Sequence, residues 1–409
     1  MTNPKSVVAG DDNPLAGLKL IDSDTHFSEP YDLWTSRAPA KYRDVLPHVK
    51  HGHDGKLHWF LRNNEMFAAG GSSFVTRDGE KIPWFEKDFT TYEAWDTLHE
   101  ASYDPGARVK FMDEVGIWAQ IVYPNTLGNS MAWLIAEQDK DMAYAAVQIY
   151  NDAVAEFAAA GDNRLFPVAV MPLWDINLCV KEAERAKNEL GLHSIAMAGE
   201  VHKAGLPDLG QPDWDPLYEA VTDLKLPINI HIAAGVESAA VGAAANWTTT
   251  AWPSLNARAH KPVNSVAMEL ANSRFVSNLV LSDLAFRWPG VKWVSVESGI
   301  GWIPYVLERV DYEYLEDYPS APAPSRPTAA EMFQKNCYAT FWFEDSGPQR
   351  LLDIIGVNNV MWETDFPHPT CLHPDAVLRS AKALAGLGPD VLRRIVQDNA
   401  AELYNIDLD

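Results

Sequence analysis

A short apolar run near the start of the chain ends in an acidic residue and a histidine separated by one position. Asp24 and His26 close the run Leu20–His26. Alternate side chains of a β-strand point to the same side, so in a strand this carboxylate and this imidazole would lie together. Such a pair suits a divalent metal ion. Taken alone, the pair also fits a turn-forming Asp beside a His that only packs.

Three more apolar runs, far along the chain, end in or just before residues of the same kind: His231, Glu297 and Asp365. If all four runs are parallel strands of one barrel, their carboxyl ends form one ring and the polar residues meet there. The alternative is that five polar residues cap their strands independently, which requires more coincidences. The pattern therefore favours a metal centre.

The elements that would position these residues alternate between strand and helix periodicity. The expected strands cover residues 20–26, 119–122, 165–170, 194–197, 227–231, 291–296, 338–343 and 360–363. The expected helices cover residues 104–115, 137–160, 175–190, 214–224, 263–287, 302–314, 374–385 and 389–404. This alternation predicts an α/β fold, a (β/α)₈ TIM barrel with its site at the carboxyl ends of the strands.

The expected organisation is a flexible tail over residues 1–17 and one barrel domain over residues 18–409. The stretch 29–103 is far longer than an ordinary connection, so it is predicted to form an inserted subdomain over the barrel mouth. Within it, residues 56–62 and 65–68 predict a β-hairpin that turns at two asparagines. Four histidines of this insertion are interpreted as surface residues, namely His48, His51, His53 and His58.

Composition limits the possible partners. The formal net charge is −23 and the isoelectric point about 4.8, which argues against nucleic acid or an anionic membrane as a partner. Three dispersed cysteines are too few for a disulfide framework or a thiolate metal site, and they suit a cytoplasmic protein. We find neither a secretory signal nor an apolar stretch long enough for a membrane helix.

The order of acid-x-His, a central His and a late Asp resembles the amidohydrolase superfamily. The resemblance is to the amidohydrolase-related branch that contains the aminocarboxymuconate-semialdehyde and resorcylate decarboxylases, and it spans about residues 18–405. It implies a metal-dependent hydrolase or carbon–carbon lyase. It also implies a metal ion held by Asp24, His26, His231 and Asp365. Mixed carboxylate and imidazole ligation without sulfur admits Zn²⁺, Mn²⁺ or Fe²⁺.

The first ligand position is Asp24, where some relatives have His or Glu, but the more consequential departure from the family pattern is at strand six. Relatives that decarboxylate commonly carry a His at the end of strand six, where this chain has Glu297. Together with Asp24 and Asp365 it makes three carboxylates with a formal charge of −3. One divalent ion brings the net charge of this cluster to −1, and two bring it to +1. Glu297 is therefore expected either to bind a second ion or to act as a general base with a raised pKa. His368, in a proline-rich loop, could replace the missing imidazole, bind that second ion, or simply pack.

The remaining predictions concern substrate and assembly. Glu29 and Trp302 are expected to orient a substrate, and Trp252, Phe341 and Trp342 suggest a pocket for a carboxylated or aromatic small molecule. The resemblance also permits a dinuclear iron or manganese oxygenase acting as a hydroxylase, and a non-catalytic partner subunit is a further alternative. We expect a homo-oligomer, with a hetero-oligomer left open.

Overall fold

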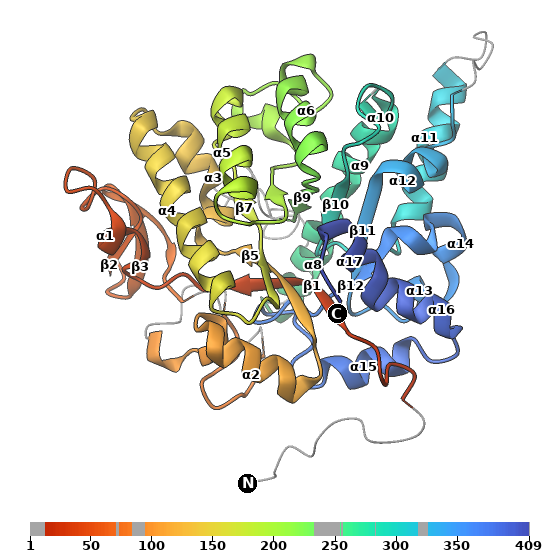
Figure 1. The fold of residues 1–409 in the computed structure, drawn as a ribbon, viewed down its shortest axis with the longest axis horizontal. Helices are drawn as coiled ribbons and strands as arrows, with labels where there is room; N and C mark the ends of the chain where they lie inside the picture. The colour runs from red at the N-terminus through yellow and green to blue at the C-terminus, as the bar shows by residue number, and fades with distance from the viewer. Residues whose placement is uncertain are drawn as a thin grey trace.

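The computed structural model describes residues 13–70, 73–83, 95–232, 254, 257–282, 284–317 and 326–408. Its centre is a ring of parallel strands (Figure 1). These strands are β1 (Ile21–Phe27), β5 (Ala119–Pro124), β6 (Leu165–Pro167), β7 (Ala169–Val170), β8 (Ile195–Ala196), β9 (Ile228–His231), β10 (Trp293–Val296), β11 (Cys337–Phe341) and β12 (Val360–Trp362). They pair in this order, with β6 and β7 forming one interrupted strand.

The ends of the ring meet at β1. The backbone N–H of His26 donates to Phe366 O at 2.7 Å, and that of Asp365 donates to Asp24 O at 3.0 Å. The interrupted strand is bridged in a similar way, because Val168 N–H donates to Val122 O on one side and Ala169 N–H to Ser194 O on the other. The predicted eight-stranded TIM barrel is confirmed by this arrangement together with the structural relatives reported below.

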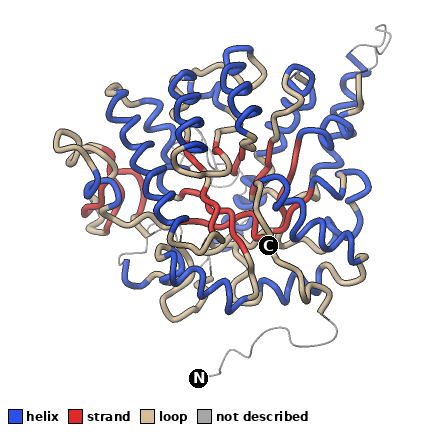
Figure 2. Tube along the Cα trace, in the orientation of Figure 1, coloured by secondary structure: helices blue, strands red, loops and turns tan. Residues whose placement is uncertain are grey.

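Helices surround the strands (Figure 2). They include α2 (Pro105–Val115), α3 (Thr126–Ala136), α4 (Lys140–Ala159), α5 (Ile176–Asn188), α6 (Asp215–Leu224), α8 (Ala257–Glu269), α9 (Asn272–Leu281), α10 (Leu284–Arg287), α11 (Ile303–Asp317), α12 (Ala329–Asn336), α13 (Ser346–Arg350), α14 (Leu352–Ile355), α15 (Ala376–Ala383), α16 (Pro389–Arg393) and α17 (Asn399–Tyr404). Two of these helices have side-chain caps at their N-termini, since the Asp104 carboxylate accepts Ala107 N–H and that of Asp175 accepts Leu178 N–H.

Two predicted helices differ from those observed. The helix expected over residues 263–287 consists of α8, α9 and α10, and α8 begins before Pro262, which lies inside it. A proline is uncommon in the interior of a helix, and the predicted helix begins just after it. The helix expected from residue 137 begins at Lys140, after Asp139 caps it, and α3 precedes it.

The insertion contains a three-stranded antiparallel sheet of β2 (His48–His51), β3 (Leu57–Leu61) and β4 (Asn64–Ala68). The predicted hairpin is confirmed, although Arg62 takes the left-handed conformation in its turn, with φ 55°. Trp34 in α1 (Leu33–Arg37) donates its indole N–H to Ala146 O of α4 at 2.9 Å. Further along, Phe74 N–H donates to Pro367 O beyond β12. A role of the insertion as a subdomain over the barrel mouth remains a prediction.

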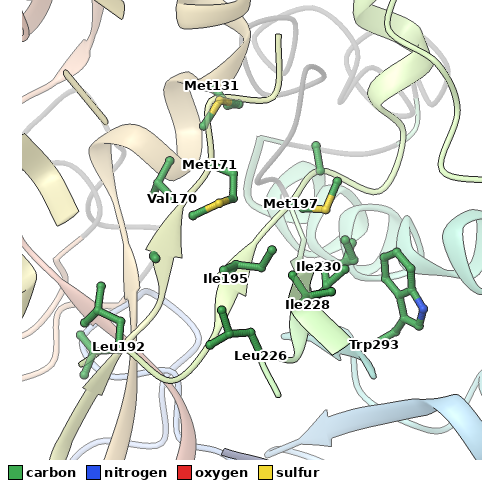
Figure 3. Close-up of a cluster of buried hydrophobic side chains, with 14 of the residues drawn as sticks. Met131, Val170, Met171, Leu192, Ile195, Met197, Leu226, Ile228, Ile230 and Trp293 are labelled. Carbon is green, nitrogen blue, oxygen red and sulfur yellow. The ribbon is translucent and has the colours of Figure 1, made fainter. Parts of the chain in front are cut away.

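The hydrophobic core has two parts because strand side chains alternate. One side belongs to a large cluster that also contains side chains of the helices. Figure 3 shows part of this cluster, with Met131, Val170, Met171, Leu192, Ile195, Met197, Leu226, Ile228, Ile230 and Trp293 labelled. The other side fills the barrel, where Ile21, Ile121, Val294, Val296 and Met361 pack together. Along β9, Ile228 and Ile230 belong to the cluster on the helix side. Because successive side chains of a strand point to opposite sides, His231 points toward the barrel interior.

The C-terminal segment helps to fill the barrel. Ala400, Ala401, Tyr404 and Ile406 pack into the interior cluster. The Tyr404 hydroxyl donates to Asn229 Oδ1 at 2.7 Å, and the Tyr123 hydroxyl donates to the same oxygen at 2.8 Å. Residues separated by more than 100 positions therefore share one buried polar contact beneath the carboxyl ends of the strands.

Candidate metal centre

Strand β1 supplies two of the candidate ligands. Its pairing with β5 shifts register between Asp22 and Thr25, an irregularity typical of β-bulges near functional sites. Simple alternation does not predict this bulge, yet the two side chains meet. Asp24 Oδ1 lies 3.4 Å from His26 Nε2, and both residues are buried.

The other strands bring their candidate ligands to the same place. His26 Nε2 lies 3.2 Å from His231 Nε2 and 3.6 Å from Asp365 Oδ1. His231 Nε2 also lies 3.4 Å from Asp24 Oδ2 and 3.1 Å from Glu297 Oε2. The structure therefore gathers, at the carboxyl ends of four barrel strands, the residues that the sequence singled out.

The hydrogen bond of the His231 ring indicates what it offers to this cluster. Its Nδ1 lies 2.6 Å from Ile232 O, an acceptor, so the ring hydrogen belongs on Nδ1 and Nε2 presents a lone pair. That lone pair faces the Nε2 atom of His26 and oxygens of Asp24 and Glu297. A carbonyl that holds the far nitrogen is the usual arrangement of a metal-binding histidine.

The carboxylates are also arranged as ligands. Both side-chain oxygens of Asp24 and Oδ1 of Asp365 have no hydrogen-bond partner among the described residues, although both side chains are fully buried. Buried charges without partners are costly, and a cation removes that cost. Three carboxylates and two imidazoles without sulfur suit Zn²⁺, Mn²⁺ or Fe²⁺, so the residues fit the predicted ion.

The electrostatics point the same way. Burial raises the pKa of Asp24 well above its usual value, and Asp365 and Asp22 raise it further. Burial also raises the pKa of Glu297, with help from Asp365 and Asp24. Burial lowers the pKa of His26 and of His231. Without a cation the protein thus disfavours the charged forms of these four groups, and a bound divalent ion would reverse this for Asp24 and Glu297.

Glu297 and Asp365 share an uncommon backbone conformation. Their φ angles are 52° and 62°, in the left-handed region that non-glycine residues rarely occupy. Such strain costs on the order of 1 kcal/mol or more per residue and collects at functional sites. Glu297 is held there by its backbone N–H, which donates to the Thr340 hydroxyl at 3.0 Å.

His368 lies beside the cluster on the side of Asp365. Its Nδ1 is 3.0 Å from Asp365 Oδ1 and 4.0 Å from Glu297 Oε2. Its ring stacks on that of His26 with centroids 3.5 Å apart. The structure therefore places His368 within the centre and not merely in a surface loop. Asn125, which the sequence did not single out, contacts its other nitrogen at 2.7 Å.

A fully buried arginine supports the strand end that carries His26. Arg108 of α2 donates from Nη2 to His26 O at 2.5 Å and from Nη1 to Gln120 Oε1 at 3.1 Å. Its Nε donates to Ala101 O. Nothing in the sequence around Arg108 indicated this role, because each partner comes from a different part of the chain.

Asp22 continues this network below the candidate ligands. Its carboxylate accepts the backbone N–H of Thr364 at 2.8 Å, the Thr364 hydroxyl at 2.6 Å and Gln120 Nε2 at 3.2 Å. Burial nevertheless raises the pKa of Asp22 to about 7. The network ties β1 to the segment just before Asp365 and so fixes two ligands relative to each other.

The two residues expected to orient a substrate have other partners. Glu29 accepts the N–H groups of Asn125 and Thr126 on Oε1, at 3.0 and 2.9 Å, and the Thr126 hydroxyl on Oε2 at 2.9 Å. This geometry makes Glu29 a cap of α3. Trp302 is half-buried and donates its indole N–H to Ser298 O at 2.8 Å. Substrate contact by either residue remains a prediction.

Glu29 gives a testable dependence of stability on pH. Burial raises its pKa from 4.5 to about 7, so the folded chain keeps this proton to higher pH than the unfolded chain. The contribution of Glu29 to the free energy of unfolding is therefore lost as pH rises from 4.5 to about 7. Glu29→Gln lacks the titration, and its stability relative to wild type should rise by about 3 kcal/mol from pH 4.5 to above pH 7.

Urea unfolding at pH 5 and pH 8 measures this difference. Glu184→Gln, a change of an exposed glutamate on α5, serves as the matched control and should follow wild type at both pH values. If Glu29→Gln and wild type lose stability equally between the two pH values, Glu29 does not titrate in this range.

The insertion contains a second group of ligand-type residues, and here one prediction is wrong. His58 is not a surface residue. Its side chain is buried, with Nε2 3.0 Å from Asp54 Oδ1 and Nδ1 3.2 Å from Glu65 Oε1. The expectation holds for His53, whose side chain is fully exposed, and for exposed His51. The two carboxylates face opposite nitrogens of the ring, an arrangement that suits a hydrogen-bonded imidazole better than one ion.

Several other residues bear on the expected pocket. Trp252 lies outside the described residues. Phe341 packs in the core between strands and helices, and Trp342 packs against Leu372.

Glu363, which the sequence analysis did not single out, is fully buried, and neither of its oxygens has a hydrogen-bond partner among the described residues. Burial raises its pKa well above the usual value, and Asp24 and Asp365 add to this.

The barrel and its cluster of carboxylates and imidazoles define the class, a TIM-barrel enzyme with a site suited to a divalent metal. A model of the amidohydrolase family matches residues 21–406, and the chain belongs to this family. The predicted resemblance to the amidohydrolase superfamily and the prediction of an enzyme are thereby confirmed. Among the described residues no helix combines the length and the apolar character needed to cross a membrane.

Comparisons with known proteins agree. The chain is 26% identical over 299 residues to a gamma-resorcylate decarboxylase from Polaromonas sp., covering 70% of this chain and 84% of the relative. An amidohydrolase from Mycobacterium avium subsp. paratuberculosis superposes with a TM-score of 0.72 at 19% identity, covering 96% and 99% of the two chains.

Two further solved structures share the fold. A 5-carboxyvanillate decarboxylase from Sphingomonas paucimobilis gives a TM-score of 0.62 at 20% identity, covering 96% of this chain and 100% of its own. A dihydroxybenzoic acid decarboxylase from Polaromonas sp., with bound manganese and the inhibitor 2-nitroresorcinol, gives 0.61 at 19%, covering 95% and 97%. These relatives give no support to the oxygenase or the non-catalytic alternative.

Proposed function

We propose that this chain is a metal-dependent decarboxylase of an aromatic carboxylic acid. The observation that carries the proposal is the buried ring of ligands at the strand ends, in which carboxylate oxygens of Asp24 and Asp365 lack partners among the described residues. The names of its relatives, which act on resorcylate, carboxyvanillate or dihydroxybenzoate, support the substrate class.

In this proposal one divalent ion is held by Asp24, His26, His231 and Asp365. Mn²⁺ is favoured because the ligands are oxygen and imidazole and because a solved relative carries manganese. When bound, the ion supplies positive charge to the carboxylate of the substrate and to a neighbouring oxygen. The protein positions the ligand side chains through β1, β9 and the loop after β12.

Decarboxylation breaks the bond between the ring carbon and the carboxylate. Carbon dioxide leaves, the electron pair stays on the ring carbon, and a proton replaces the lost group. Because the strand-six histidine of relatives is absent, Glu297 and His368 are the titratable groups beside the ion that remain for this proton. Burial and the charges of Asp365 and Asp24 raise the pKa of Glu297, which suits a proton donor. Binding a second ion is the other role open to this pair.

The test is decarboxylation of a panel of hydroxylated benzoates and 5-carboxyvanillate, measured as released carbon dioxide. The manganese-loaded chain should convert at least one of them. Removal of the metal by a chelator should lower the rate at least about 100-fold, because the charge that offsets the substrate carboxylate is lost. Added Mn²⁺ should restore the rate.

The metal-depleted protein is its own control for folding, through circular dichroism. If the manganese-loaded protein converts no aromatic acid but hydrolyses an aryl ester or amide, the chain is a hydrolase and not a decarboxylase. Turnover that survives complete metal removal would contradict both. Assembly as a homo-oligomer and a cytoplasmic location remain predictions.

A further inference from the structure

The two aspartates of the candidate metal centre are held differently. Neither side-chain oxygen of Asp24 has a hydrogen-bond partner among the described residues. Asp365 is fully buried too, but only its Oδ1 lacks such a partner. Its Oδ2 accepts the hydroxyl of Thr370 at 2.7 Å. Asp24 can therefore present either oxygen to a cation, whereas Asp365 has one oxygen already engaged.

The engaged oxygen of Asp365 sets the direction of the free one. An aspartate carboxylate turns about a soft bond, so a hydrogen bond that fixes one oxygen also fixes the other. With Oδ2 on Thr370, Oδ1 lies 3.6 Å from His26 Nε2 and 3.0 Å from His368 Nδ1, among the atoms that could hold a metal ion. Without the hydroxyl, both oxygens of a buried carboxylate would be free to exchange places.

Thr370 is itself held by the barrel. It lies in the loop after β12, five residues beyond Asp365. Trp342, which is 2% exposed, donates its indole N–H to Thr370 O at 3.3 Å. Leu372 N–H donates to Thr364 O at 3.1 Å, which folds the loop back on the residue before Asp365. The loop therefore brings the hydroxyl to the carboxylate by contacts on both sides of it.

The insertion holds the same loop from outside. Phe74 N–H donates to Pro367 O at 2.8 Å, and the ammonium group of Lys81 donates to Cys371 O. One of these contacts lies before Thr370 in the sequence and the other directly after it. The place of the hydroxyl thus depends on the inserted segment as well as on the barrel.

We propose that Thr370 is a positioning residue of the metal centre, whose hydroxyl holds Oδ2 of Asp365 so that Asp365 presents Oδ1 to the cation. The inference rests on the proposed function for the presence of a bound divalent ion. Thr370 acts through Asp365 and needs no contact of its own with the ion. Residues that orient a metal ligand in this way typically change metal affinity about 10- to 100-fold.

The affinity for Mn²⁺, measured by calorimetric titration of chelator-stripped protein, tests this role. Thr370→Val keeps the branched shape of the side chain and removes the hydroxyl, so the affinity should fall about 10- to 100-fold. Thr370→Ser keeps the hydroxyl and should bind Mn²⁺ as wild type does. Thr370→Ala differs from Thr370→Ser by that one group and should bind as weakly as Thr370→Val.

Thr222→Val is the matched control. The Thr222 hydroxyl is half-buried like that of Thr370 and donates to Tyr218 O at 2.7 Å, but it lies on α6 and outside the cluster of candidate ligands. This variant should keep the wild-type affinity for Mn²⁺. Urea unfolding of the metal-free variants shows which of them are folded before the titration. If Thr370→Val does not fold, the comparison of Thr370→Ala with Thr370→Ser decides.

Three results would overturn the inference and leave the proposed function intact. The first is wild-type affinity in the variants that lack the hydroxyl. The second is an affinity in Thr370→Ser as low as in Thr370→Val, because the methyl group would then matter and not the hydroxyl. The third is an equal loss in Thr222→Val, which would indicate a general loosening of the fold. A wild-type chain that binds no Mn²⁺ would overturn both the inference and the proposed function.

Discussion

His231→Asn should release the metal and lower kcat/KM at least about 1000-fold, a loss of about 4 kcal/mol of transition-state stabilisation. The imidazole Nε2 that faces Asp24, His26 and Glu297 disappears with this change, and the shorter amide cannot reach the same place. Metal per chain and the rate on the best substrate of the panel measure the two effects.

His193→Asn is the matched control for this variant. His193 also directs Nδ1 to a backbone carbonyl, that of Tyr404 at 2.6 Å, but it lies outside the cluster of candidate metal ligands. The control should keep the metal and the rate. Full metal content and rate in His231→Asn would remove His231 from the centre and contradict the proposed ligand set.

Arg108→Met should destabilise the folded chain by about 3–5 kcal/mol, the range for breaking a buried charged network. The change leaves the carbonyls of Ala101 and His26 and the Gln120 amide oxygen without their donor. Because Arg108 holds the backbone of His26, the affinity for Mn²⁺ should fall as well.

Urea unfolding of the metal-free protein measures the first effect, and metal titration of the folded variant measures the second. Arg379→Met, a change of an exposed arginine on α15, should alter neither. An Arg108→Met protein that unfolds at the wild-type urea concentration would show that solvent or a neighbouring side chain replaces the lost donors.

The sequence predicts the strand ends well because each one has a local signal. An apolar run followed by Asp24, His231 or Asp365 is visible within a few residues. The barrel rule then brings these positions together without knowledge of any contact. The bulge in β1 does not upset this, because Asp24 and His26 still lie 3.4 Å apart.

Residues that act through distant partners leave no such signal. Arg108 and Asn125 lie far from His26 and His368 in sequence, and each resembles an ordinary residue of a helix or a loop. His58 was grouped with its neighbours by composition, although strand β3 turns it inward between two carboxylates. In each case the partner is set by packing between separate elements, which periodicity does not report.

The late position of Tyr404 and Ile406 in the sequence bears on how the protein is made. These side chains fill the barrel, and the Tyr404 hydroxyl completes the contacts of buried Asn229. Until residues 399–406 have joined the fold, the barrel strands surround a space that lacks these groups. The barrel therefore stays loosely packed until this last segment has docked, and slow docking would lengthen its exposure to chaperones and proteases.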